Sequence, residues 1–203
     1  MSVKLSANFT LEELTYSETA HKYVEATEFQ IGMLKELCQN LLQPIRNKFG
    51  PVRITSGLRD LLVYRAMLKA GYEPSKTSDH FLVPSLYQHK GDWLVPTCAP
   101  NPRGKGAVDF YALGANIWDV YYWILDNVRP SRDFNQVIIY SKKYSNRGDF
   151  IHLSNPARLF IAKSIIPSKR PIMVYVKGNR RFKNDTYVSF NEFKKIMRKR
   201  FKE

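Results

Sequence analysis

The stretch Gly104-Lys-Gly-Ala-Val-Asp-Phe-Tyr-Ala112 sets a single carboxylate, Asp109, in a run of small and apolar residues. This pattern is typical of a buried β-strand, and it predicts a strand over Ala107–Ala112. Three other short runs have a similar character and predict strands over 52–55, 136–140 and 150–153. The strand that carries Asp109 therefore has several short partners with which it can form a sheet.

Helices are predicted between these strands. Thr10-Leu-Glu-Glu13 and Thr27-Glu-Phe-Gln30 are capping boxes, in which side chains at the start of a helix bind its first backbone N–H groups. The second box predicts a long helix to about Phe49, which Pro44 should kink or break. Two more helices are predicted, over 59–70 and 115–127.

The order of these elements indicates the fold class. Helices and short strands are mixed without the regular strand–helix–strand rhythm of a doubly wound sheet, which favours an α+β fold. We predict a small mixed domain with a short antiparallel central sheet flanked by helices. The segment 81–103 contains several prolines and has no helical period, so a long loop is expected there.

Composition excludes several classes of protein. Of the 203 residues, 44% are hydrophobic and 13% are aromatic, which allows a sizeable core and excludes disorder of the whole chain. No apolar run has the length of a membrane-spanning helix. The two cysteines, Cys38 and Cys98, cannot form a disulfide framework and lack a CxxC spacing, so free thiols are expected. The polar N-terminus predicts a chain without a signal peptide.

The positive charge is concentrated near the C-terminus. Residues 163–203 hold thirteen Lys or Arg and three Asp or Glu, and so carry most of the net charge of +14. We predict a first domain over 1–162 and a basic extension over 163–203. Within the extension, a hairpin is expected from 172–176 and 186–190, followed by an amphipathic helix that begins after Ser189.

Such a charge run has two interpretations. It is either a solvated face of a segment that packs on the body of the protein, or a surface for an anionic partner. The anionic partner could be the bacterial cell envelope, a membrane or a nucleic acid.

Two of the four histidines lie in distinctive motifs, Ser78-Asp-His80 and Gly148-Asp-Phe-Ile-His-Leu-Ser154. Taken one at a time, a histidine is more often a hydrogen-bonded structural residue than a metal ligand. Asp109 could likewise simply pair with a nearby base. Spacing alone does not decide between these alternatives.

Taken together, the motifs resemble the M15 family of zinc D,D- and L,D-peptidases, especially its phage-type, murein-cleaving branch. The resemblance extends from Leu5 to about Pro156, and its motifs occur in the family's order. They are Leu5-Ser-Ala-Asn-Phe-Thr-Leu-Glu-Glu-Leu-Thr-Tyr-Ser17, Leu41-Leu-Gln-Pro-Ile-Arg46, Val52-Arg-Ile-Thr-Ser-Gly-Leu-Arg59, Ser78-Asp-His80, Gly106-Ala-Val-Asp-Phe110, Asn135-Gln-Val-Ile-Ile-Tyr140 and Phe150-Ile-His-Leu-Ser154.

The resemblance implies a zinc site. His80, Asp109 and His152 correspond to the three protein ligands of Zn²⁺, and a fourth position is left for water, as in catalytic zinc sites. Asp149, three residues before His152, corresponds to the general base. The family uses a carboxylate at this position.

The resemblance also implies residues that contact the substrate. Arg59 corresponds to an arginine that binds a substrate carboxylate or the developing oxyanion. It could alternatively be a surface residue at the start of a helix. Ser78 and Gln136 match family positions and are expected to support substrate binding rather than to react.

One departure from the family is large. Twenty-eight residues separate His80 from Asp109, far more than in the family. Because the entropic cost of closing a loop grows only logarithmically with its length, the two ligands can still meet. The inserted segment carries His89, which could support the site or compete as a ligand. Its Tyr87 and Trp93 could line a substrate groove or form a small core of the loop.

The predicted function is zinc-dependent hydrolysis of peptide bonds in peptidoglycan stem peptides or cross-bridges. A phage lysin is expected, located in the host cytoplasm before lysis or associated with the virion. The basic extension would attach it to the anionic cell envelope. A non-catalytic virion component on the same fold is the alternative. A nucleic-acid-binding protein is a weaker one, because no nucleic-acid motif accompanies the charge.

Overall fold

A six-stranded sheet forms the centre of the computed structural model, and its strand order is β13-β12-β8-β9-β7-β3. The model describes residues 2–74, 78–81, 106–128, 136–140 and 149–155 in full, the backbone of further short strands between 87 and 183, and residues 195 and 199. The strands are β3 (Val52–Ser56), β7 (Ala107–Ala112), β8 (Gln136–Tyr140), β9 (Phe150–Ser154), β12 (Ile172–Val176) and β13 (Arg180–Lys183).

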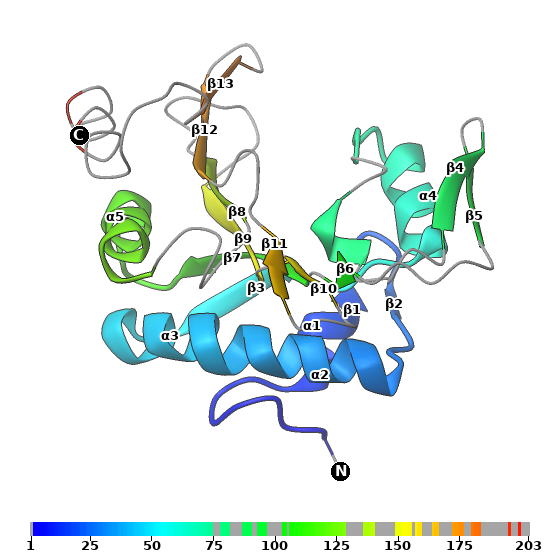
Figure 1. Cartoon of the computed structure of the whole chain (residues 1–203), viewed down its shortest axis with the longest axis horizontal. Helices are drawn as coiled ribbons and strands as arrows, with labels where there is room; N and C mark the ends of the chain where they lie inside the picture. Colours follow the sequence, from blue (N-terminus) through cyan, green and yellow to red (C-terminus); the bar gives the residue numbers. More distant parts are fainter. Residues whose placement is uncertain are drawn as a thin grey trace.

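The pairing of these strands confirms the α+β class. The pairs β3–β7, β7–β9 and β9–β8 are antiparallel, as predicted for the central sheet. Strand β12 then joins β8 in parallel, and β13 returns antiparallel to β12. The sheet is therefore mixed, and part of the basic C-terminal segment belongs to it (Figure 1).

The predicted helices are present, with one correction. They are α1 (Leu11–Thr15), α2 (Glu28–Leu37), a π-helix (Cys38–Leu42), α3 (Gln43–Phe49), α4 (Leu61–Lys69) and α5 (Ile117–Asn127). Both capping boxes form, at Thr10 and at Thr27. Of the kink or break predicted at Pro44, the break does not occur, because the helical elements follow one another without a gap from Glu28 to Phe49. A π-turn precedes Pro44, which is a known way to accommodate a residue that lacks an N–H group.

Smaller elements surround this framework. They are β1 (Tyr16–Ser17), β2 (Lys22–Tyr23), the 3₁₀-helix η2 (Asp79–Phe81), β4 (Tyr87–Lys90), β5 (Trp93–Pro96), β6 (Arg103–Gly104), β10 (Ala157–Leu159) and β11 (Ser164–Ile166). The prediction of a structureless loop over 81–103 is therefore wrong in part, since β4 and β5 pair antiparallel. The intervening Gly91-Asp92 is a residue pair typical of a two-residue hairpin, a signal that the prediction overlooked.

The C-terminal segment also differs from its prediction. The first strand of the predicted hairpin is β12, but its partner is β13 rather than 186–190, which lie outside the described residues. Lys195 and Lys199 are helical and exposed, in agreement with the predicted helix at those two positions. The division at residue 162 into two domains stays a prediction.

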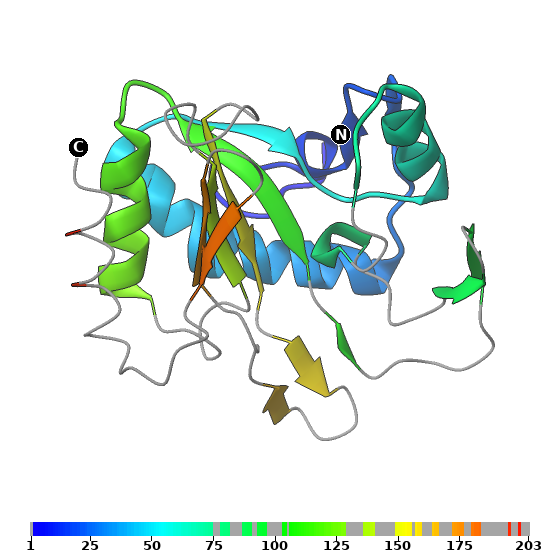
Figure 2. The ribbon, with the colours of Figure 1, turned by 90° about the horizontal axis from the view of Figure 1, so that it is seen from above.

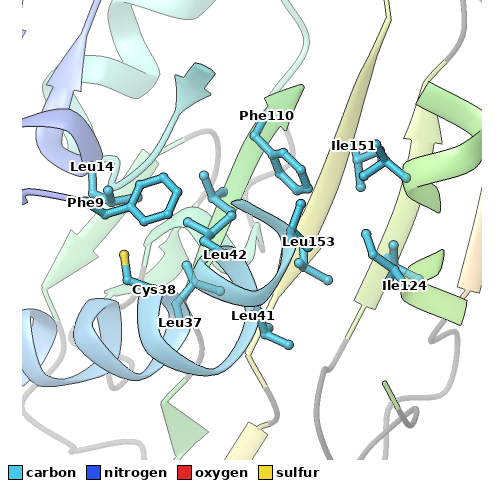
Figure 3. Close-up of a cluster of buried hydrophobic side chains, with 14 of the residues drawn as sticks. Phe9, Leu14, Leu37, Cys38, Leu41, Leu42, Phe110, Ile124, Ile151 and Leu153 are labelled. Carbon is cyan, nitrogen blue, oxygen red and sulfur yellow. The ribbon is translucent and has the colours of Figure 1, made fainter. Parts of the chain in front are cut away.

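The hydrophobic core lies between one face of the sheet and the helices. Figures 1 and 2 show the long helix of α2, the π-helix and α3 crossing this face, with α5 beside it. Leu37, Leu41 and Leu42 of the long helix point toward Phe110 and Leu153 of the sheet (Figure 3). The opposite face of the sheet carries Asp109 and His152, together with a small apolar cluster of Ile138, Tyr140 and Phe150. No helix in the described ranges is long and apolar enough to cross a membrane.

The reactivity of the Cys38 thiol can be used to test how tightly this core is packed. The Cys38 side chain is fully buried, and burial, with a smaller effect from the charge of Glu13, raises the pKa of its thiol to about 12. In a Cys98→Ser variant, where Cys38 is the only thiol, iodoacetamide at mildly alkaline pH should leave the folded protein unmodified and label it only in denaturant. Rapid labelling of the folded protein, followed by mass spectrometry, would show that the core opens at this helix.

Candidate metal centre

Strand register brings two of the predicted ligands together. Asp109 on β7 and His152 on β9 are directly opposite each other, so their side chains lie on the same face of the sheet. The neighbouring positions alternate to the other face, where Val108 and Leu153 enter the core. His80 comes from the 3₁₀-helix η2, and the three side chains meet on the face away from the core.

The three donor atoms converge on one point. Asp109 Oδ1 lies 2.8 Å from His152 Nδ1 and 3.1 Å from His80 Nε2, and the two ring nitrogens are 3.2 Å apart. Ligand bonds of about 2.0–2.1 Å at tetrahedral angles place donor atoms about 3.3 Å apart. The triad therefore has nearly the spacing that one face of a tetrahedral zinc site requires. It is the group of side chains that could hold a metal ion within the described residues.

Hydrogen bonding determines which nitrogen of His80 is free for a metal. His80 Nδ1 lies 2.8 Å from the carbonyl oxygen of Gly57, which can only accept, so Nδ1 carries the proton. Nε2 of the neutral ring then directs a lone pair at Asp109 Oδ1, which is also an acceptor. Two acceptors this close are favourable only with a cation or a proton between them, and this chemistry fits a metal ion.

Asp109 divides its two oxygens between different partners. Oδ1 faces both histidines, and Oδ2 accepts a hydrogen bond of 3.0 Å from Arg59 Nη2. Ser56 Oγ accepts from the same guanidinium, at 2.9 Å from Nη2 and 3.1 Å from Nε. A bulge in β3 between Ile54 and Ser56 sets Ser56 opposite Asp109, and bulges often re-aim side chains in this way beside functional sites.

The segment from Gly57 to Arg59 holds His80 through its backbone. The carbonyl of Gly57 binds the His80 ring, and the N–H of Arg59 donates to the His80 carbonyl at 2.9 Å. Leu58 N–H donates to the carbonyl of Leu14, at the end of α1. A side chain at residue 57 would place its Cβ 2.1 Å from that oxygen, so only glycine permits this approach.

The electrostatics of the cluster suit metal binding. Burial raises the pKa of the Asp109 carboxyl, but interaction with the adjacent His80 and His152 rings outweighs burial, so the net pKa lies well below its usual value. Burial, followed by the charge of Arg59, lowers the pKa of His80. An ionised aspartate and a neutral histidine are the protonation states in which these groups bind metals.

The other predicted site residues occupy different positions. Arg59 is 9% exposed and bound to Asp109, so it is not the surface residue of the alternative interpretation. The hydroxyl of Ser78 lies 3.4 Å from the His80 N–H, which supports the 3₁₀-helix. Gln136 begins β8, opposite Ser154 of β9 and two residues from the position that pairs with His152. Asp149 is exposed in the bend before β9.

Two contributions to the site were not assigned from the sequence. Ser56 and Gly57 both lie in a quoted motif, but their hydrogen bonds to Arg59 and His80 depend on contacts across the fold. His89 belongs to β4, and the structure describes only the backbone of that strand. The choice between its two predicted roles therefore stays open.

Comparison of the chain with protein-family models, with curated proteins and with solved structures gives no match. Membership of the M15 family therefore stays a hypothesis that rests on the motifs. The arrangement of His80, Asp109 and His152 supports a metal site independently of that family.

Ligand variants test the site. Purified wild-type protein should retain one tightly bound zinc, and His80→Ala or Asp109→Ala should lower zinc affinity by orders of magnitude, because each removes one of three ligands. The measurement is metal analysis after dialysis, with circular dichroism to verify the fold. His89→Ala should keep its zinc. Full zinc in the two ligand variants would refute the assignment, and its loss in His89→Ala would add a ligand from the inserted segment.

Proposed function

We propose that the protein is a zinc-dependent peptidase that hydrolyses peptide bonds in bacterial peptidoglycan. The observation that carries the proposal is the convergence of His80, Asp109 and His152 within hydrogen-bond distance of one another on one face of the sheet. The order of the family-like motifs around these residues supports the peptidase activity and the murein substrate.

The site has the donor set of a catalytic rather than a structural metal centre. Structural zinc sites have four protein ligands, whereas here three donors are brought together among the described residues. A bound zinc ion would supply a Lewis acid for the scissile carbonyl and would lower the pKa of a water molecule in the fourth position. The protein's part is to hold the three donors and to place a base and a substrate beside them.

We assign the role of general base to Asp149. Asp149 lies in the bend just before β9, three residues before His152, and it is exposed to solvent. The carboxylate would accept the proton of the attacking water and pass it to the leaving amine. Ser78, two residues before His80, and Gln136, at the start of β8 beside β9, are proposed to support the substrate.

Release of murein fragments tests this function. Purified sacculi incubated with the zinc-loaded protein should yield stem peptides, and mass spectrometry of the products identifies the bond that is cut. Asp149→Asn should retain zinc and fold but lose about 10²–10⁴-fold in rate, because the amide cannot accept a proton. Asp119→Asn, an exposed change on α5 behind the opposite face of the sheet, is the matched control and should be unaffected.

Two outcomes would contradict the proposal. Near-wild-type rates for Asp149→Asn would remove that residue from the mechanism. A protein that binds zinc but releases nothing from sacculi would favour the non-catalytic virion component that the sequence leaves as the alternative.

We further propose that the basic C-terminal segment attaches the enzyme to the anionic cell envelope. Its net charge supports this role, as does the exposure of Lys195 and Lys199, each of which is helical. Because β12 pairs with β8 and β13 pairs with β12, removal of the whole segment would take two strands from the sheet. Substitution of exposed lysines is therefore the cleaner experiment.

The double variant Lys195→Gln/Lys199→Gln should bind sedimented sacculi more weakly at low salt, with unchanged cleavage of a small soluble stem peptide. The difference should shrink as salt is added, because exposed charges are screened over about 8 Å at physiological ionic strength. Lys48→Gln/Lys69→Gln removes the same charge from α3 and α4 and is the control. An equal loss of binding in both variants would show that net charge, rather than the C-terminal segment, attracts the protein to the wall.

A further inference from the structure

We propose that Arg59 is a positioning residue of the metal centre, which holds Asp109 Oδ2 so that Oδ1 alone is directed at the metal. The proposal rests on the proposed zinc site. It assigns Arg59 a role different from the substrate contact that the family resemblance implies.

The contacts of Asp109 divide cleanly between its two oxygens. Oδ2 is bound by Arg59 Nη2 at 3.0 Å, whereas Oδ1 is the oxygen within 2.8 Å and 3.1 Å of the two histidines. A carboxylate that is free to rotate can offer both oxygens to a metal ion. One whose second oxygen is bound by a guanidinium can offer only the first, so the Arg59–Asp109 pair favours monodentate binding.

The guanidinium is itself held rigidly. Ser56 Oγ accepts hydrogen bonds from both Nε and Nη2, so the planar group is fixed along one edge. Arg59 also donates its backbone N–H to the carbonyl of His80. A single residue therefore contacts two of the three ligands, and these two lie on either side of the inserted segment.

Burial makes this ion pair difficult to break. Arg59 and Asp109 are each 9% exposed. Separating a buried charge pair leaves an uncompensated charge inside the protein, which is strongly unfavourable. Moving the Arg59 side chain from Asp109 to a substrate would therefore be unfavourable in free energy. The ion pair thus keeps the Asp109 carboxylate in one orientation before a metal ion binds.

The consequence concerns the coordination number. Three monodentate donors leave a tetrahedral ion one position for water, whereas a bidentate aspartate would occupy a fourth position itself. Arg59 thereby protects the open position on which hydrolysis depends. It acts through Asp109 and touches neither the metal nor the reacting atoms.

Cobalt substitution tests this role without an activity assay. The protein is loaded with Co²⁺, whose visible absorption is intense when four-coordinate and weaker when five-coordinate. Arg59→Met should lower Co²⁺ affinity about 10–100-fold, the usual effect of losing a partner that orients a ligand, and should weaken the visible bands. Arg53→Met, an exposed arginine on the same strand as Ser56, is the control and should change neither measurement.

A second variant keeps the test decisive if Arg59→Met fails to fold. Ser56→Ala leaves the guanidinium in place but removes both hydrogen bonds that brace it, so it should shift affinity and spectrum in the same direction by a smaller amount. Wild-type affinity and spectrum in Arg59→Met, or in Ser56→Ala when Arg59→Met does not fold, would overturn the positioning role. An unchanged spectrum with a raised KM would instead assign Arg59 to the substrate.

Failure of the proposed function has a different signature. Wild-type protein that binds neither Co²⁺ nor Zn²⁺ would refute the metal centre itself. Wild-type protein that binds Co²⁺ with the four-coordinate spectrum but releases no murein fragments would refute the hydrolysis while leaving the role of Arg59 intact.

Discussion

The site depends on how the carboxylate of Asp109 is shared. One oxygen lies against two histidine nitrogens and the other against a buried guanidinium, so a single charged group connects β7, β9, η2 and the segment that follows β3. A buried carboxylate is stable only when its oxygens are fully bound. The need to satisfy this group therefore fixes where His80, His152 and Arg59 must lie, and it leaves three metal donors facing one another.

The two faces of the sheet differ around Asp109. One face carries Val108, Phe110, Ile151 and Leu153 into the core beneath the long helix and α5, where apolar burial provides most of the stabilisation. The residues between them in the same strands, Asp109 and His152, face the other way. The core thus supplies a rigid support for the ligands, which is what a metal site with an open position needs.

The 28 residues between His80 and Asp109 in the sequence are compatible with the site because residues that precede His80 hold it in place. Its ring and its carbonyl are bound by Gly57 and Arg59, which precede it in the chain, and Leu58 between them donates its N–H to the carbonyl of Leu14. The position of His80 therefore does not rest on the residues that follow it. The inserted segment can therefore adopt its own local structure, such as the β4–β5 hairpin, without displacing His80.

Local signals in the sequence determined most of the elements and the identity of the candidate ligands. Capping boxes specify where α1 and α2 begin, because they satisfy backbone groups within one turn, and the strand patterns around Asp109 and His152 specify their faces. Tertiary structure alone decided the rest. The π-turn before Pro44, the parallel pairing of β12 with β8, and the partners of Arg59 all depend on groups distant in the chain. A hydrogen bond between Ser56 and Arg59, or between Gly57 and His80, exists only once packing brings those groups within reach, and no local pattern encodes that distance.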